Sequence, residues 1–503
     1  MISFSQRKSG AILGYVNVIA KNAINLIYTP LLLRFLTQGD YGVFQMVNAT
    51  VMSLSLLNMG FSSSYIRFYS RKRAAHDEDG LKKLNGMYLT IFLVIALICF
   101  AAGLFLWANT DVFFKKGLTS DEIVLAKTLI LIMVINLAIQ FPASVFDSYI
   151  VAHERFVFQQ TRQLFTSLAT PCIAVVLLIC GFGAIGVASA QLFIAFVLFG
   201  MNVKYAVKNL GMRFSFYGFE FSLFREIAIF SFWIFLNQIF DLVNNNVPNL
   251  VLGAVSGAAT VAVFAIALQV RTVFVSLSSV VSNIFVPKIN QIVSTYNDNR
   301  DLTQLMVKSG RVQMLVFFLL YGGFALVGRF FVEVWAGSGY VDAYWMILIM
   351  TLPLAVPLSQ NTGIEIQRAK NMHKARSIVY IFTSVINVIF SFIMAHYFGY
   401  WATTWGYVIS IVLGTGLFMN WYYHVKIGLD MKYFWKRMLP IIVASAAVFA
   451  VCKFFSLVIV IDGWGGFLCY GCLYVLLFCF VMWRFVLTSQ EKAIFPIAWI
   501  GKR

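Results

Sequence analysis

Charged residues are scarce in this chain, and acidic residues are the scarcest of them. Only 12% of the 503 residues are charged, with 38 lysine and arginine residues but only 20 aspartate and glutamate residues. A soluble domain carries about twice that share of charge. Hydrophobic residues make up 60% of the sequence, and the mean hydropathy is +0.83. This composition excludes an ordinary soluble domain and predicts an all-α polytopic membrane protein.

Motifs for nucleotide, metal or redox chemistry are also missing. No GxxxxGK[ST] sequence is present to hold the phosphates of ATP. The five histidines lack metal-ligand spacing, and the seven cysteines lie mostly within apolar runs. The glycine-rich run from Gly181 to Gly186 joins two apolar segments without the preceding strand of a dinucleotide site. We therefore expect no enzyme, no cofactor and no metal.

The basic excess gives a formal charge of +18, which in a soluble protein would suggest nucleic acid. Here the lysines and arginines lie in short links between apolar runs, so nucleic-acid binding is not expected. Most of them fall in one alternate set of links. Because basic links are retained in the cytoplasm, both termini are predicted to be cytoplasmic.

Apolar runs long enough to cross a bilayer, about 20 residues each, recur along the chain. They predict about fourteen transmembrane helices, an even number that places both ends on one side. The predicted spans are residues 11 to 33, 42 to 66, 86 to 108, 125 to 150, 165 to 182, 184 to 204, 226 to 252, 258 to 286, 312 to 334, 343 to 366, 377 to 397, 401 to 424, 438 to 459 and 465 to 487.

One polar pattern occurs in the first predicted span and again, 220 positions later, in the seventh. Its members are Asn17, Lys21 and Asn25, and then Asn237, Asp241 and Asn245. A spacing of four places each trio on one helical face, and charges at bilayer depth are costly outside a polar cavity. The pattern predicts a transporter with two pseudo-symmetric six-helix lobes, residues 1–215 and 216–430, followed by two additional helices in 431–503.

Arg271, in the eighth predicted span, is a further candidate for substrate binding. A guanidinium cannot lose its proton in the bilayer, and the flanking run from Val261 to Val281 contains no acid. An anionic ligand would supply the partner. For Lys21 and Asp241 the alternative is a mutual ion pair that holds the two lobes together.

Asp147 and Glu365 are candidates for ion coupling, together with Asp241. Both also lie near the ends of their predicted spans, where Arg155 and Arg368 are close enough in sequence to pair with them. Solvation or pairing of this kind is the alternative to a coupling role.

Several short motifs accompany this organisation: Gly39-Asp40-Tyr41-Gly42-Val43-Phe44, Leu57-Asn58-Met59-Gly60, Arg67-Phe68-Tyr69 and Ala152-His153-Glu154-Arg155-Phe156. Together they resemble the Wzx-type polysaccharide flippases of the multidrug, oligosaccharidyl-lipid and polysaccharide (MOP) exporter superfamily, which has a MATE-like fold. Asn58 departs from the pattern where we expect an acid.

The resemblance implies a flippase that carries undecaprenyl-pyrophosphate-linked oligosaccharide from the cytoplasmic to the outer leaflet of the bacterial inner membrane, for O-antigen, capsule or related polysaccharides. It implies alternating access between the lobes and, as partners, polysaccharide polymerase and ligase machinery. Arg67, within one motif, joins the substrate-binding candidates. Arg271 resembles an arginine of the lipid II flippase, but the first span offers only Lys21 rather than several arginines, which disfavours lipid II as the cargo.

Two other functional classes stay open. A cation-coupled multidrug antiporter of the same superfamily would depend on Asp241, Asp147 and Glu365 and would tolerate Lys21→Ala and Arg271→Ala. A membrane scaffold that recruits glycan-synthesis enzymes through its basic links would tolerate cavity substitutions and fail when the links are changed.

Overall fold

The computed structural model describes residues 2–58, 60–115, 117–218, 221–283, 289, 292–293, 298–370, 372, 374–459 and 463–492. These residues form helices and contain no strand. Twelve of their helices are long and apolar enough to cross a membrane. The predicted all-α polytopic fold is confirmed, while the total of fourteen spans stays a prediction.

The second predicted span is a broken helix, which explains why it is absent from those twelve. α2 (Gln38–Ser53) passes into a tighter turn at Leu54–Asn58, and α3 (Phe61–Ala74) begins after Gly60. Gly60 has a φ of 74°, which glycine adopts without steric cost. Each half is shorter than the roughly 20 residues of a straight crossing.

The seventh predicted span is also divided, into α9 (Phe221–Asn245) and α10 (Val247–Val255). Pro248 lies in the first turn of α10. Proline has no N–H to give to a preceding turn but fits the start of a helix, so the chain breaks just before it. Several side chains of α9 lie outside the described residues.

Contacts divide the chain into two compact units. The first unit comprises Met1–Ala265 and Val388–Thr403, and the second comprises Ile266–Asn387 and Thr404–Arg503. These boundaries cut through helices and differ from the predicted lobe boundaries. The predicted lobes rest on a pattern in the sequence, whereas the units come from packing. The division at residues 215 and 430 therefore stays a prediction.

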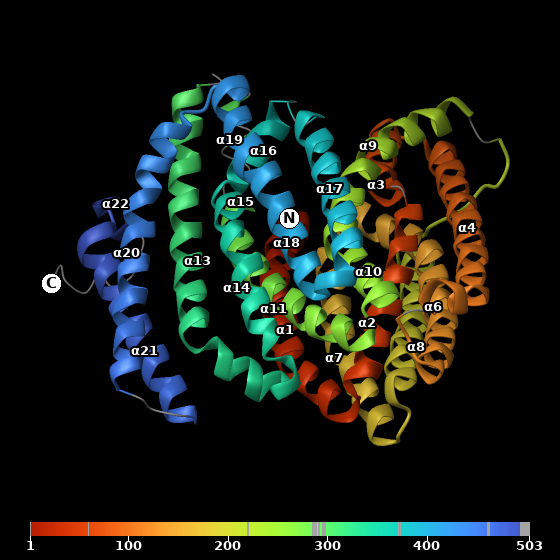
Figure 1. The fold of residues 1–503 in the computed structure, drawn as a ribbon. Coiled ribbons are helices and arrows are strands. Elements are labelled where there is room, and N and C mark those ends of the chain that lie inside the picture. Colours follow the sequence, from red (N-terminus) through yellow and green to blue (C-terminus); the bar gives the residue numbers. More distant parts are fainter. Residues whose placement is uncertain are drawn as a thin grey trace. The chain divides into compact units, whose positions relative to one another are not determined.

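In the first unit, α6 packs against α2, α3, α4 and α8, and α1 packs against α7 (Figure 1). α6 and α7 are the arms of a hairpin that turns at residues 153–155, where Glu154 has a φ of 57°. Besides α2, α3, α9 and α10, this unit contains α1 (Ile2–Phe35), α4 (Glu78–Ala108), α5 (Thr110–Phe114), α6 (Ser120–Ala152), α7 (Phe156–Ile179), α8 (Gly183–Lys204) and the start of α11 (Ala258–Asn283). Residues 388–403, at the end of α17 and the start of α18, also belong to it.

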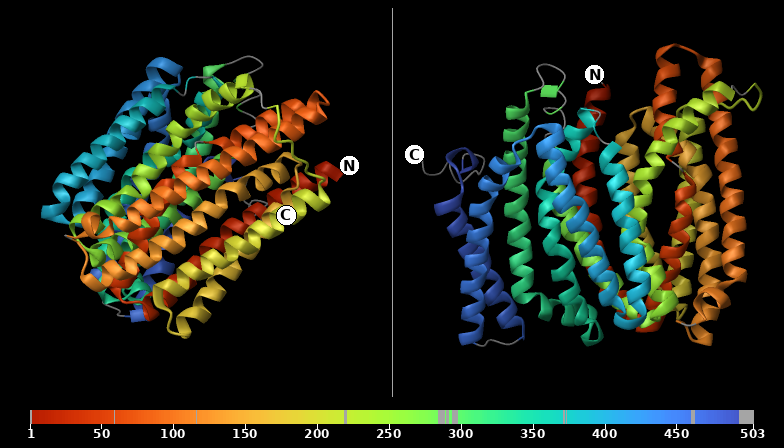
Figure 2. Two further views of the ribbon diagram at one scale, coloured as in Figure 1. Left: turned by 90° about the vertical axis from the view of Figure 1, so that its right-hand side faces the viewer. Right: turned by 45° about the horizontal axis from the view of Figure 1, so that its top comes forward.

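In the second unit, the long helix α13 packs against α20 and α21, and also against α14, α15 and α16. α13, α20 and α21 run side by side in Figure 1 and again in the right-hand view of Figure 2. The helices wholly within this unit are α13 (Asn299–Ala336), α14 (Asp342–Thr351), α15 (Ala355–Ser359), α16 (Asn361–Ala369), α19 (Met419–Tyr422), α20 (Met431–Val458), α21 (Gly463–Val481) and α22 (Ser489–Lys492). The unit also holds the rest of α11, the first part of α17 (Lys374–Phe398) and the last part of α18 (Tyr400–Ile411).

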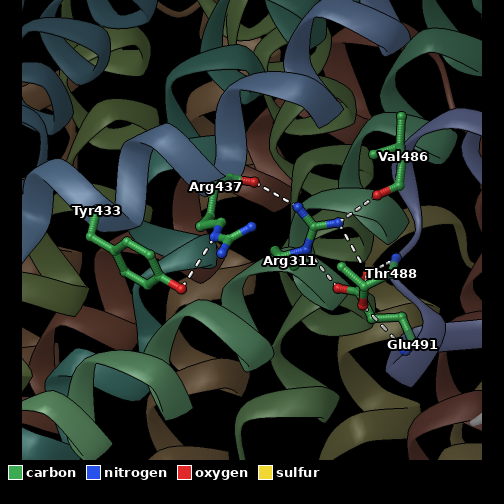
Figure 3. A network of polar contacts seen from close by, with 6 residues as sticks. All are labelled: Arg311, Tyr433, Arg437, Val486, Thr488 and Glu491. Carbon is green, nitrogen blue, oxygen red and sulfur yellow. Dashed lines mark hydrogen bonds and ion pairs between the residues drawn. The ribbon is translucent and has the colours of Figure 1, made fainter.

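A buried arginine joins α13 to the C-terminal end of the described chain (Figure 3). Arg311 Nε and Nη2 donate to the two carboxylate oxygens of Glu491 at 2.6 and 3.0 Å, and the side chains are only 7% and 9% exposed. Arg311 also donates to the carbonyl oxygens of Arg437, at 2.7 Å, and Val486, at 2.9 Å. We call this network the C-terminal clamp.

Gly42 allows α2 to pack closely on the start of α11, and we expect Gly42→Ala to destabilise the protein. An added Cβ would lie 1.9 Å from the backbone carbonyl oxygen of Ala258, so the helices must separate at a cost of about 1–3 kcal/mol. Thermal unfolding in detergent measures the loss. Gly200→Ala in α8 is the control, because nothing lies within 4 Å of its Cβ; equal stability of the two variants would contradict this packing.

Candidate functional site

A cavity of about 1010 Å³ lies within the first unit, between α1, α2, α6, α7 and α8. Its wall is rich in amide and hydroxyl side chains. The polar residues that line it are Asn17, Lys21, Asn25, Tyr28, Asn48, Asn136, Gln140, Ser144, Asp147, Gln160, Arg162, Gln163, Thr166, Ser167, Thr170, Gln191 and Asn202. We call this space the N-terminal cavity.

The charge of the N-terminal cavity comes from Lys21, Arg162 and Asp147, two cations and one anion. The lining therefore has a formal charge of +1. Its amides can donate and accept hydrogen bonds through one side chain, as can its hydroxyls. Such a wall suits a ligand that carries many hydroxyl groups and a negative charge.

Asn17 fixes the position of α1 against α7 at the edge of this cavity. Its Nδ2 donates to the backbone oxygen of Gln160 at 2.8 Å and to its side-chain Oε1 at 2.7 Å. Asn17 is 9% exposed, and its own Oδ1 accepts no hydrogen bond from the described residues. A buried oxygen without a hydrogen bond costs free energy. A hydroxyl group of a ligand could donate a hydrogen bond to Asn17 Oδ1.

Lys21 lies one helical turn beyond Asn17, and its side chain is exposed where it lines the cavity. Asn25, another turn along, also lines it. The structure therefore brings the whole first trio to one cavity. The side chains of Asn237 and Asp241 lie outside the described residues, and Asn245 is exposed. The equivalence of the two trios, and a Lys21–Asp241 ion pair, stay predictions.

Asp147 pairs with Arg162 across the α6–α7 hairpin. Arg162 Nη2 lies 2.6 Å from Asp147 Oδ1, and Arg162 Nη1 donates to Asn202 Oδ1 of α8 at 2.5 Å. The partner of Asp147 is therefore Arg162. Arg155, which is closer to Asp147 in sequence, is not its partner in the described ion pairs. Asp147 and Arg162 lie five and six residues from the hairpin ends, or roughly 7–9 Å along their helices, so they meet at equal depth.

Two other candidates belong to the second unit and are not among the cavity residues. Arg271 is 4% exposed, and its guanidinium carbon lies 4.4 Å from the centre of the Tyr407 ring, a cation–π geometry. Glu365 pairs with Arg368 one turn away at 2.7 Å, which is the alternative that the sequence left open beside a coupling role.

Arg67 also lies outside the N-terminal cavity. It is exposed, and its guanidinium carbon lies 4.4 Å from the centre of the Phe230 ring within the first unit. Its predicted role in substrate binding stays a prediction.

The sequence reasoning missed the polar face of α7. The sequence places Arg162 in a link because the fifth span is predicted to begin at residue 165, whereas α7 begins at Phe156. The available signal was the spacing of Gln160, Gln163, Ser167 and Thr170, which follows a helical period. These residues all line the cavity.

Many apolar helices long enough to cross a bilayer define a multi-pass membrane protein. Solved structures share its fold. The chain is similar to "Lipid II flippase MurJ, inward closed conformation", with a TM-score of 0.72 and 16% identity, over 98% of this chain and 99% of that one. It is also similar to the structure described as "Inward-facing conformation of a multidrug resistance MATE family transporter of the MOP superfamily", with a TM-score of 0.62 and 14% identity, over 83% and 99%.

The family follows from the sequence match. Residues 7–293, more than half of the chain, match the family described as "Polysaccharide biosynthesis protein", and the chain belongs to this family. A relative described as "Uncharacterized membrane protein EpsK", from Bacillus subtilis (strain 168), is 22% identical over 484 residues, 92% of each chain. The resemblance inferred from the short motifs is thus confirmed at the level of family and fold.

Proposed function

We propose that the protein is a flippase that moves undecaprenyl-pyrophosphate-linked oligosaccharide from the cytoplasmic to the outer leaflet of a bacterial membrane by alternating access. The observation that carries the proposal is the N-terminal cavity, with its amide and hydroxyl wall and its net positive lining. Membership of a polysaccharide biosynthesis family supports a glycan cargo. The similarity of fold to a lipid II flippase supports a lipid-linked one.

In this proposal the sugar occupies the amide-lined part of the cavity, and its hydroxyls bond with side chains such as Asn17. Lys21 attracts the pyrophosphate. The basic links and both termini face the cytoplasm, as the positive-inside rule implies. Glycan-polymerising and ligating enzymes would then receive the cargo on the far side.

Outward movement of the anion does not require ATP. A membrane potential that is negative inside favours it by about 2.3 kcal/mol per charge per 100 mV. A pyrophosphate head group would therefore move down its electrical gradient, and substitutions that weaken the cationic lining should slow its entry.

The test is leaflet exposure of a fluorescent polyprenyl-pyrophosphate oligosaccharide in proteoliposomes under an imposed potential. We expect potential-dependent appearance of the sugar on the far leaflet, with a loss of about tenfold or more in Lys21→Ala, because one charge-assisted contact is worth 1.5–3 kcal/mol. Lys453→Ala is the control, since Lys453 is an exposed lysine of α20 outside the cavity. Absence of translocation by folded wild-type protein would reject the proposal.

The second candidate is a cation-coupled multidrug antiporter, favoured by Asp147 in the cavity wall and by the MATE-like fold. The neighbouring Arg162 works against it, because it neutralises the carboxylate that an organic cation would need. Efflux of an organic cation that is driven by a sodium or proton gradient and lost in Asp147→Asn would support this candidate instead.

A further inference from the structure

The Asp147–Arg162 ion pair is open to the N-terminal cavity. Both residues line it, and the Asp147 side chain retains 34% of its exposure, compared with 10% for Arg162. A pair that served only to join α6 and α7 would be expected to lie between the packed faces of the helices. In this pair the Asp147 oxygen that faces Arg162, Oδ1, is buried and accepts no hydrogen bond from the described residues, while the rest of the side chain is exposed where it lines the cavity.

Two contacts hold the guanidinium of Arg162 in place at the cavity wall. Asn202, which is 4% exposed, accepts from its Nη1, while Nη2 meets Asp147. Only the contact to Asn202 is a hydrogen bond, and the contact to Asp147 is an ion pair, so the guanidinium has further N–H donors for an anion. The planar fork of a guanidinium matches phosphate oxygens as well as it matches a carboxylate, and Asn202 would keep the fork in place during an exchange.

Lys21 lines the same cavity as Arg162, at a similar depth along its helix. The contact between Asn17 and Gln160 sets the level of α1 against α7. Lys21 lies four residues from Asn17, or roughly 6 Å along α1, and Arg162 lies two residues from Gln160, or roughly 3 Å along α7. Both cations line the one cavity, so a pyrophosphate with two charged groups matches them.

We propose that Asp147 is a placeholder counter-ion for Arg162, and that a pyrophosphate oxygen of the lipid-linked substrate takes its place when the substrate enters. This inference rests on the proposed function and names the group that the site recognises. No covalent bond changes. One oxygen anion replaces another on the guanidinium, and the released Asp147 is solvated in the cavity.

The exchange would avoid both an unpaired buried arginine and an anion site that binds its cargo too tightly. An unpaired arginine in a low-dielectric wall is costly, and a permanently available one would hold its cargo too firmly. Asp147 satisfies Arg162 in the empty state and competes with the cargo for it. The carboxylate therefore lowers affinity and favours release.

Equilibrium binding to the purified full-length protein in detergent tests the exchange, with geranyl pyrophosphate, inorganic pyrophosphate and geraniol as probes. We expect Arg162→Gln to weaken geranyl pyrophosphate binding by about tenfold, because a charge-assisted contact is lost. Arg162→Lys should recover part of it. Asp147→Asn should tighten binding severalfold, because the competitor is removed, and geraniol binding should not respond to any of them.

Asp111→Asn is the matched control, because Asp111 forms an exposed ion pair with Lys127 at 2.5 Å outside the cavity. It should leave all binding constants unchanged. A loss of affinity in Asp147→Asn equal to that in Arg162→Gln would show a purely structural pair and overturn the inference. Equal binding of inorganic pyrophosphate and geranyl pyrophosphate would overturn the assignment to a lipid head group.

The binding pattern and the leaflet assay separate the two proposals. If Asp147→Asn tightens and Arg162→Gln weakens pyrophosphate binding while the wild type moves no lipid, the ion-pair exchange stands and the flippase assignment fails. If the lipid is moved with no such pattern, the flippase stands and the exchange fails.

Discussion

Reversing the charge at Lys21 should nearly abolish movement of the lipid-linked oligosaccharide while leaving the fold intact. Lys21 is exposed to the N-terminal cavity and makes no ion pair among the described residues. An anion about 5 Å from it gains about 3 kcal/mol at an effective dielectric constant of about 20, or about a hundredfold in affinity. The Lys21→Met variant should therefore bind the anion about a hundredfold more weakly. Lys21→Glu should lose more affinity than that, and Lys21→Arg should lose little.

Initial rates in proteoliposomes below saturation check this series, because the charge acts on binding from the cytoplasmic leaflet. Lys453→Glu is the matched reversal outside the cavity and should retain the wild-type rate. A series in which Lys21→Glu gains efflux of an organic cation as it loses the lipid would point to an antiporter. Equal initial rates in all three Lys21 variants and the wild type would show that Lys21 takes no part in substrate binding.

The broad architecture was predictable because it rests on properties that do not depend on packing. Long apolar runs specify membrane helices through their length alone, and the all-α fold is confirmed. The break in the second span was less visible, since Gly60 is only one of 34 glycines and nothing local marks which of them adopts a positive φ. The break before Pro248, by contrast, follows from the chemistry of proline.

The site was predictable in part. Lys21 stood out because an isolated charge in an apolar run is costly, and Asn17 and Asn25 follow from helical spacing. Arg162 did not stand out, because it lies near a hairpin where a link was expected. Its pairing with Asp147 depends on the depth at which two helices meet, which the sequence does not state.

The C-terminal clamp should have the largest effect on stability of any single ion pair described. Burial alone would raise the pKa of the Glu491 carboxyl, but the hydrogen bonds from Arg311 and from the Thr488 backbone outweigh it and hold that pKa below its ordinary value of 4.5. A depressed carboxyl pKa contributes stability above the ordinary value and loses it as the pH falls through the lowered one. The clamp should therefore be intact at neutral pH and weaken below about pH 4.5.

We expect Arg311→Gln to cost on the order of 3–5 kcal/mol at neutral pH, because it leaves the Glu491 carboxylate buried without its partner. Arg437→Gln is the control within the same network, since Arg437 contributes only its backbone oxygen to Arg311 and should change stability by about 0.5 kcal/mol or less. The double variant Arg311→Met with Glu491→Leu should lose less than Arg311→Gln, because no buried charge remains. Thermal unfolding in detergent compares the stability of the three variants. If the double variant is as unstable as Arg311→Gln, the clamp acts through the hydrogen bonds from Arg311 to the Arg437 and Val486 carbonyl oxygens rather than through the ion pair.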